Sequence, residues 1–169
     1  MEVHQYISWN IRGANSVESR FQIKQMIEAN RPAIFCLQET KCMQWKDFEL
    51  YSLGFGRNVG WKHSPSRGQS GGLLTIWNTD SIEVTSHSIS RHWLMIKGIN
   101  KVNQEAFACI NVYAPQESIQ KVHLWEELGI TISTLQECSV CLLGDFNAVR
   151  SAEEKFLCGC IYFRHRVEI

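Results

Sequence analysis

The run AIFCLQE, residues 33–39, holds five apolar side chains in succession before it ends in two polar ones. A strand with one face in water alternates apolar and polar residues, whereas a strand covered on both faces reads as a continuous apolar run. Residues 33–39 therefore predict a strand inside a layered fold, and Gln38 and Glu39 predict that its carboxyl end reaches a polar environment.

The segments around this run alternate between strand and helix signals. Upstream, residues 3–9 alternate as a strand, and Ser16 or Ser19 caps a helix that Pro32 closes. Downstream, the patterns predict a short helix within 43–54, a loop or hairpin at 57–72, strands at 73–78, 81–89, 92–99 and 106–115, a helix over 117–136 and a strand at 139–146. This order predicts a single α/β domain over residues 1–169, with helices covering the faces of the sheets.

Two apolar faces are expected to hold the helices against the sheets. They comprise Val17, Phe21, Ile23, Met26 and Ile27 in the first helix, and Val122, Leu124, Trp125, Leu128 and Ile132 in the long one.

Composition argues against several classes of protein. The 17 basic and 17 acidic residues cancel, so no global field draws the chain to nucleic acid or a membrane surface. No apolar run reaches about 18 residues, so no membrane span is expected, and no secretory signal is visible. The odd count of seven cysteines favours a reducing, intracellular compartment, with nucleus and cytoplasm both open. A zinc site built from Cys138, Cys141, Cys158 and Cys160 is disfavoured, because the second pair has the wrong spacing.

Oxygen-bearing side chains end three separate strands. Asn10 ends the first, Gln38 and Glu39 the second, and Asp145 and Asn147 the last. Ligands bind beyond the carboxyl ends of strands in sheet architectures, so these ends are expected to converge. Carboxylate and amide oxygens suit Mg²⁺. A spacing of two places Asp145 and Asn147 on the same side of an extended end; the alternatives are an Asx turn there and a plain turn residue at Asn10.

Five ordered motifs carry a resemblance to a known family. SWNIRG, LQETK, SGGLLTIW, NVYAP and GDFN resemble the endonuclease/exonuclease/phosphatase superfamily, and most closely the apurinic-type endonuclease domain of LINE-type non-LTR retroelements. The resemblance implies a four-layer α/β sandwich, in which two packed mixed β-sheets are flanked by helices. It also implies Mg²⁺-dependent hydrolysis of DNA phosphodiesters, with Mn²⁺ as a possible substitute.

The resemblance also assigns roles to individual residues. Glu39 resembles the principal metal ligand, and Asn10 resembles the amide that supports it at the metal. Tyr113 matches a tyrosine that contacts the scissile phosphate. Asp145 matches the aspartate that activates water or assists the leaving group, and Asn147 matches the amide that orients the nucleophile or phosphate.

The chain departs from the family pattern in two places. The final Ser-Asp-His motif is missing, so the fold is expected to be incomplete at the C-terminus and the activity weak or lost. Gln116 stands where the related endonucleases usually have Asn after YAP. Two alternatives stay open: an inactive retroelement-derived remnant that binds nucleic acid, and a phosphatase or phosphodiesterase acting on small phosphate esters.

A basic segment before the third motif suggests a contact with DNA. Arg57, Lys62, His63 and Arg67 are candidates to hold phosphates, and Trp61 to stack on a base. An ordinary exposed hairpin tip explains the same residues equally well. DNA is the expected partner, with no membrane and no obligate protein partner.

Overall fold

The computed structural model describes residues 5–68, 70–135 and 137–147. Along these residues run β1 (Tyr6–Asn10), α1 (Val17–Asn30), β2 (Ile34–Gln38), α2 (Asp47–Tyr51), β3 (Val59–Ser64), β4 (Leu73–Asn78), β5 (Ile82–Ile89), β6 (Trp93–Asn100), β7 (Ala106–Tyr113), α3 (Ser118–Ser133) and β8 (Ser139–Asp145). The expected incompleteness at the C-terminus falls outside these residues. Within them, every helix is too short or too polar to cross a bilayer.

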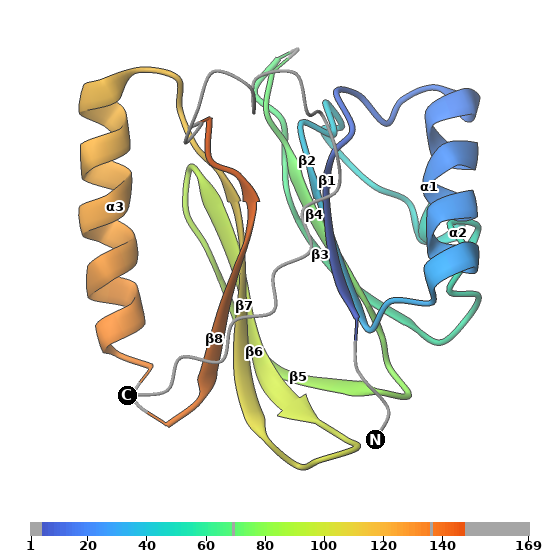
Figure 1. Cartoon of the computed structure of the whole chain (residues 1–169). Helices are drawn as coiled ribbons and strands as arrows, with labels where there is room; N and C mark the ends of the chain where they lie inside the picture. The colour runs from blue at the N-terminus through green and yellow to red at the C-terminus, as the bar shows by residue number, and fades with distance from the viewer. Residues whose placement is uncertain (1–4, 69, 136, 148–169) are drawn as a thin grey trace.

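Four layers make up the sandwich (Figure 1). One sheet has the strand order β1-β2-β4-β3 and the other β5-β6-β7-β8. Helices α1 and α2 lie outside the first sheet and α3 lies outside the second. Each sheet contains parallel and antiparallel pairs. The predicted α/β sandwich of two mixed sheets flanked by helices is confirmed.

The apolar run of residues 33–39 forms β2, which is buried on both faces as predicted. Phe35 and Leu37 pack in the core between the first sheet and its helices, whereas Ile34 and Cys36 pack in the core between the two sheets. A third core lies between the second sheet and α3. Because successive side chains of a strand point to opposite faces, one continuous apolar run supplies two cores.

Each sheet contains one parallel pair joined by a helix, β1-α1-β2 and β7-α3-β8. Parallel strands end at the same edge, so Asn10 lies beside Gln38 and Tyr113 lies beside Asp145. The β3–β4 and β5–β6 connections reach the same edge, because Leu73 pairs with Gln38 and Trp93 with Val112. We call this edge the site end of the sandwich, and the opposite edge the far end.

The helices are confirmed, but part of each predicted apolar face is wrong. Val17 and Phe21 are 86% and 53% exposed, and Val122 and Trp125 are 55% and 44% exposed. The buried positions are Ile23 and Ile27 in α1, and Leu124 and Leu128 in α3. At about 100° per residue, Phe21 lies on the opposite side of the helix from Ile23, and Val122 from Leu124. Ser16 caps α1, because its Oγ accepts a hydrogen bond from the backbone N–H of Ser19 at 3.0 Å.

Candidate active site

One amide joins the two sheets at the site end. Asn10 Nδ2 donates to Glu39 Oε1 at 2.9 Å and to Asp145 Oδ2 at 2.7 Å. The backbone N–H of Arg12 donates to Asn10 Oδ1 at 3.1 Å, which fixes the orientation of the amide. The two carboxylates from different sheets are therefore held within reach of one donor.

Tyr113 completes this group from the second sheet. Its hydroxyl lies near Glu39, and the phenol is partly buried. Burial raises the pKa of Tyr113, and the interaction with Glu39 and the charges of Glu39 and Asp145 raise it further. The hydroxyl thus stays protonated and can donate a hydrogen bond.

Asp145 and Asn147 form an Asx turn, so the predicted extended end is wrong here. The backbone N–H of Asn147 donates to Asp145 Oδ1 at 2.9 Å, and Asn147 has φ +47°. Asn147 Nδ2 donates to the Ala114 carbonyl at 2.6 Å, and Lys121 Nζ donates to the Asn147 carbonyl at 2.6 Å. The local hydrogen bond of the aspartate outweighs the strand geometry.

Unusual backbone conformations gather at the same place. Glu39 follows β2 with φ +52°, which turns the chain sharply at the predicted metal ligand. Its loop is held by Gly72, because Thr40 N–H donates to the Gly72 carbonyl. Gly72 has φ +88°, and a Cβ there would lie 2.5 Å from Thr40 Oγ1. Such strain clusters at functional sites, and it gives the SGG motif a structural reason.

The oxygen donors fit a hard divalent cation. Glu39 and Asp145 would hold it, since Mg²⁺ is bound through one or two carboxylates and keeps several waters. Asn10, the other predicted metal residue, presents its Nδ2 to both carboxylates and so holds them in place. No set of three His, Cys, Asp or Glu side chains among residues 5–68, 70–135 and 137–147 is arranged to bind a metal by itself.

The disfavoured zinc site falls only partly within the described residues. Burial raises the pKa of Cys141 to about 12, so its thiol is protonated in β8. Cys158 and Cys160 lie outside the described residues.

A cavity of about 540 Å³ opens beside Tyr113. The β3–β4, β5–β6 and β7–α3 connections line it, with Arg67, Arg91, His92 and Gln116 among the side chains. Neither arginine has an ion-pair partner among the described residues. Sequence reasoning missed Arg91 and His92, because they lie outside the motifs and only the β5–β6 turn brings them here.

The predicted DNA-contacting residues do not form one group. Residues 57–72, predicted as a loop or hairpin, contain strand β3 and the turn that leads to its partner β4. Lys62 and His63 lie on β3 and point to opposite faces. Burial lowers the pKa of His63, so its charged form is disfavoured. Arg57 lies before β3 at the far end, and only Arg67 lines the cavity beside the site.

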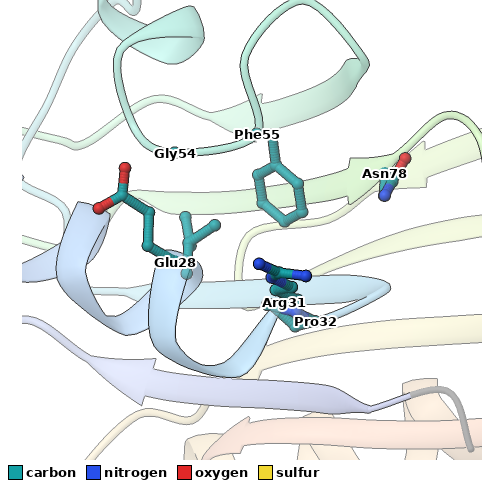
Figure 2. A pocket seen from close by; sticks show the side chains of 7 residues that line it. Glu28, Arg31, Pro32, Gly54, Phe55 and Asn78 are labelled. Carbon is teal, nitrogen blue, oxygen red and sulfur yellow. The ribbon is translucent and has the colours of Figure 1, made fainter.

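A second cavity lies at the far end (Figure 2). It has a volume of about 490 Å³ and is lined by Glu28 and Arg31 at the end of α1, with Phe55 and Asn78. The side chains of opposite charge leave this cavity without the excess of positive charge found beside Tyr113.

Comparison with known proteins identifies the family. The family model described as "Endonuclease/Exonuclease/phosphatase family" matches residues 7–165, which is most of the chain. The chain belongs to the endonuclease/exonuclease/phosphatase family. The five motifs and the four-layer sandwich agree with this membership.

Several solved structures share the fold at low identity. A family protein from Bacteroides thetaiotaomicron matches with a TM-score of 0.68 and 18% identity, covering 85% of this chain and 63% of the other. A mannosyl-6-phosphatase of the same organism gives 0.64 and 16%, with coverages of 86% and 66%. The catalytic domain of Xenopus laevis APE2 gives 0.65 and 19%, with coverages of 85% and 58%. The chain thus spans less than two thirds of each of these structures.

Proposed function

We propose that this chain hydrolyses phosphodiester bonds in DNA with the help of a divalent cation, Mg²⁺ or in its place Mn²⁺. The observation that carries the proposal is the amide of Asn10, which holds Glu39 of one sheet and Asp145 of the other. Two carboxylates that share one hydrogen-bond donor lie close enough to repel each other, and a bound cation would relieve that repulsion. Membership of the family supports the same chemistry.

Glu39 and Asp145 are the proposed metal ligands. When bound, the cation would polarise a phosphate oxygen and offset the charge that builds up in the transition state. The remaining steps fall to the side chains of the site. Each carboxylate oxygen has lone pairs beyond the one that Asn10 occupies, so both groups can accept further hydrogen bonds.

Proton transfer and orientation are assigned to three residues. Asp145 accepts the proton of the attacking water as general base. Tyr113, kept protonated, donates a hydrogen bond to an oxygen of the scissile phosphate. Asn147 orients the water through Oδ1, because its Nδ2 is engaged with the Ala114 carbonyl.

The choice of DNA as substrate rests on the cavity beside Tyr113. Arg67 and Arg91 lie there without acidic partners among the described residues, so they suit the phosphates that flank a scissile bond. Gln116 replaces the usual Asn at the rim and has a longer reach. A small phosphate ester would leave most of these contacts unused.

We further propose that the domain is of LINE-type retroelement origin. The support is the order of the five motifs. The 169 residues contain no Ser-Asp-His motif, which supplies a histidine to the phosphate in the related endonucleases. We therefore expect these 169 residues by themselves to hydrolyse DNA slowly.

The test is nicking of supercoiled plasmid by purified protein with Mg²⁺. Glu39→Gln keeps the size of the side chain and removes its charge, and we expect nicking to fall at least about 100-fold. The matched control is Glu28→Gln on α1, which removes the same charge at the far end and should leave nicking unchanged. Undiminished nicking by Glu39→Gln would contradict the proposal.

A phosphate monoester assayed in parallel separates the alternatives. Hydrolysis of the monoester without nicking of the plasmid would favour a phosphatase. Folded wild-type protein that attacks neither substrate would favour an inactive remnant. Mg²⁺ should also raise the unfolding temperature of the wild type and not of Glu39→Gln, which tests the metal site without relying on turnover.

A further inference from the structure

The layer between the two sheets changes in chemical character from one end to the other. Along three strands the inward-facing residues run from apolar or aromatic at the far end to amide at the site end: Tyr6, Ser8 and Asn10 on β1, Ile34, Cys36 and Gln38 on β2, and Phe107, Cys109 and Asn111 on β7. Gln38 and Asn111 are 1% and 0% exposed. Buried amides are costly unless every polar atom is paired, so their presence calls for a physical reason.

These amides form a closed hydrogen-bond network across the sheets. Gln38 Nε2 donates to Asn111 Oδ1 at 2.7 Å and to Ser8 Oγ at 3.0 Å. Asn111 Nδ2 has three acceptors, each at 3.2 Å: the carbonyls of Leu37 and Leu74 and the hydroxyl of Thr75. Asn111 of the second sheet thus contacts β2 and β4 of the first sheet. It also accepts a hydrogen bond from Gln38 on β2, and Gln38 is hydrogen-bonded in turn to Ser8 on β1.

The network lies directly beneath the site. Gln38 immediately precedes Glu39 and pairs in register with Asn10. Asn111 stands two residues before Tyr113 on the same face of β7, about 7 Å along the strand. Every site group that comes from these strands therefore adjoins one of the two amides.

Hydrogen bonds and apolar contacts constrain two packed sheets differently. Apolar side chains of suitable size tolerate small shifts of one sheet over the other. Hydrogen bonds lose strength with small changes in length and angle, and a fully paired buried network specifies one arrangement. The site needs such precision, because its two carboxylates come from different sheets.

We propose that Gln38 and Asn111 are positioning residues, whose buried network sets the two sheets in the register that brings Glu39 and Asp145 to one amide. The inference rests on the proposed function for its kinetic consequence. Both amides are buried, and neither lines the cavity beside Tyr113. Loss of the network should therefore lower the rate of the chemical step and the affinity for the cation, while leaving the binding of DNA nearly as it was.

The experiment replaces both amides together, Gln38→Leu with Asn111→Leu. Exchanging both partners for apolar groups of similar size leaves no orphaned amide in this pair, so the protein is expected to fold cooperatively. We expect kcat for plasmid nicking to fall at least about tenfold with KM within about twofold. Binding of Mn²⁺, followed by electron paramagnetic resonance, should weaken about fivefold or more, within the range known for changes around a metal site.

The matched control is Phe107→Leu on the same strand at the far end. It opens space between the same two sheets and lowers stability, yet it leaves the amides in place. We expect its kcat and Mn²⁺ affinity to stay at the wild-type level. Equal kcat in the double variant and the wild type would overturn the inference, as would an equal loss of kcat in Phe107→Leu.

A milder pair keeps the test decisive if the double variant does not fold. Thr75→Val and Ser8→Ala each remove one hydroxyl partner of the amides, and together they should lower kcat several-fold with little change in KM. Wild-type kcat in this pair would count against the inference.

The wild-type protein separates the two proposals. If it binds Mn²⁺ but does not nick DNA, the proposed function fails while the Mn²⁺ measurement still tests the network. Wild-type protein that neither nicks DNA nor binds Mn²⁺ would overturn both.

Discussion

At the far end of the sandwich the two sheets contact each other through aromatic side chains, whereas at the site end they contact each other through amide and carboxylate side chains. Tyr6 and Phe107 lie with their ring centroids 6.4 Å apart, across sheets. On the same strand as Tyr6, Asn10 bonds Asp145 across the sheets at 2.7 Å. Both ends also hold a cavity of similar size, about 490 Å³ and 540 Å³. Size therefore does not distinguish them, and the chemistry of the side chains does.

If the proposed function holds, the difference separates stability from function within one fold. The apolar end buries area, which stabilises the fold with little demand on geometry. The polar end collects strained backbone and repelling carboxylates, which cost stability. Three substitution experiments sharpen or break this division.

The largest effect is expected from Asn10→Leu. It removes the only side-chain donor that Glu39 and Asp145 share in the described residues, so the two carboxylates lose their common partner. We expect plasmid nicking to fall at least about 100-fold. The free energy of unfolding, measured with urea, should fall by about 1–3 kcal/mol.

The partner experiment uses the other end of the same strand. Tyr6→Phe removes a hydroxyl at the far end and should leave nicking within about twofold of the wild type. If Asn10→Leu and Tyr6→Phe reduced nicking alike, the division between the two ends would be wrong.

The second comparison, measured on stability alone, uses two glycines that both have a positive φ. Gly72 at the site end faces Thr40 Oγ1, whereas a Cβ on Gly56, at the far end, meets nothing within 4 Å. Gly56→Ala should cost about 1 kcal/mol for the left-handed backbone alone. Gly72→Ala adds crowding against a buried threonine and should cost about 1–3 kcal/mol more. Thermal and urea unfolding of both variants measure the difference, and equal losses would show that the contact with Thr40 does not matter.

The smallest effect is a dependence of stability on pH. Burial lowers the pKa of His92 and of His63, both near the site end. Below pH about 6.5, the usual pKa of histidine, these side chains bind protons in the unfolded chain but not in the folded one. The free energy of unfolding therefore falls as the pH falls toward the lowered pKa values. Above pH about 6.5 the contribution is fully present.

Single variants assign this effect. His92→Gln and His63→Gln should each flatten the decline of the urea midpoint between neutral and mildly acidic pH. His87→Gln, at an exposed position of β5, should not change it. A decline that is the same in all three variants would place its origin elsewhere in the molecule.

Much of the fold was predictable from local patterns. The run AIFCLQE indicated a strand with two covered faces, and β2 is buried throughout. Ser16 and Pro32 bracketed a helix, which ends at Asn30. The buried face of α1 was predicted only in part, because the helix has apolar residues on both sides and its sequence favours burial of Phe21 as much as burial of Ile23. Only the position of the sheet decides between them.

The convergence of the polar strand ends was predictable, and their detailed geometry was not. The ends of β1, β2 and β8 converge as the polar endings indicated, and Asn10, Glu39, Tyr113 and Asp145 meet there. Asn147 turns instead of extending, because its own N–H finds the aspartate two residues before it. The sequence did not indicate Arg91 as a site residue, and Arg57, a predicted DNA contact, lies at the far end of the first sheet.

By itself, then, the sequence determined which strands and helices form and which polar residues close the strands, because side-chain period, capping and turn chemistry act between near neighbours. Only the tertiary structure decided that one amide serves two carboxylates, that Gln38 meets Asn111 in the core, and that Arg67 and Arg91 face one cavity. Asn10 and Asp145 are 135 residues apart in the chain, and Gln38 and Asn111 are 73 apart. Contacts at such separations leave no local pattern, since they depend on how two complete sheets pack together.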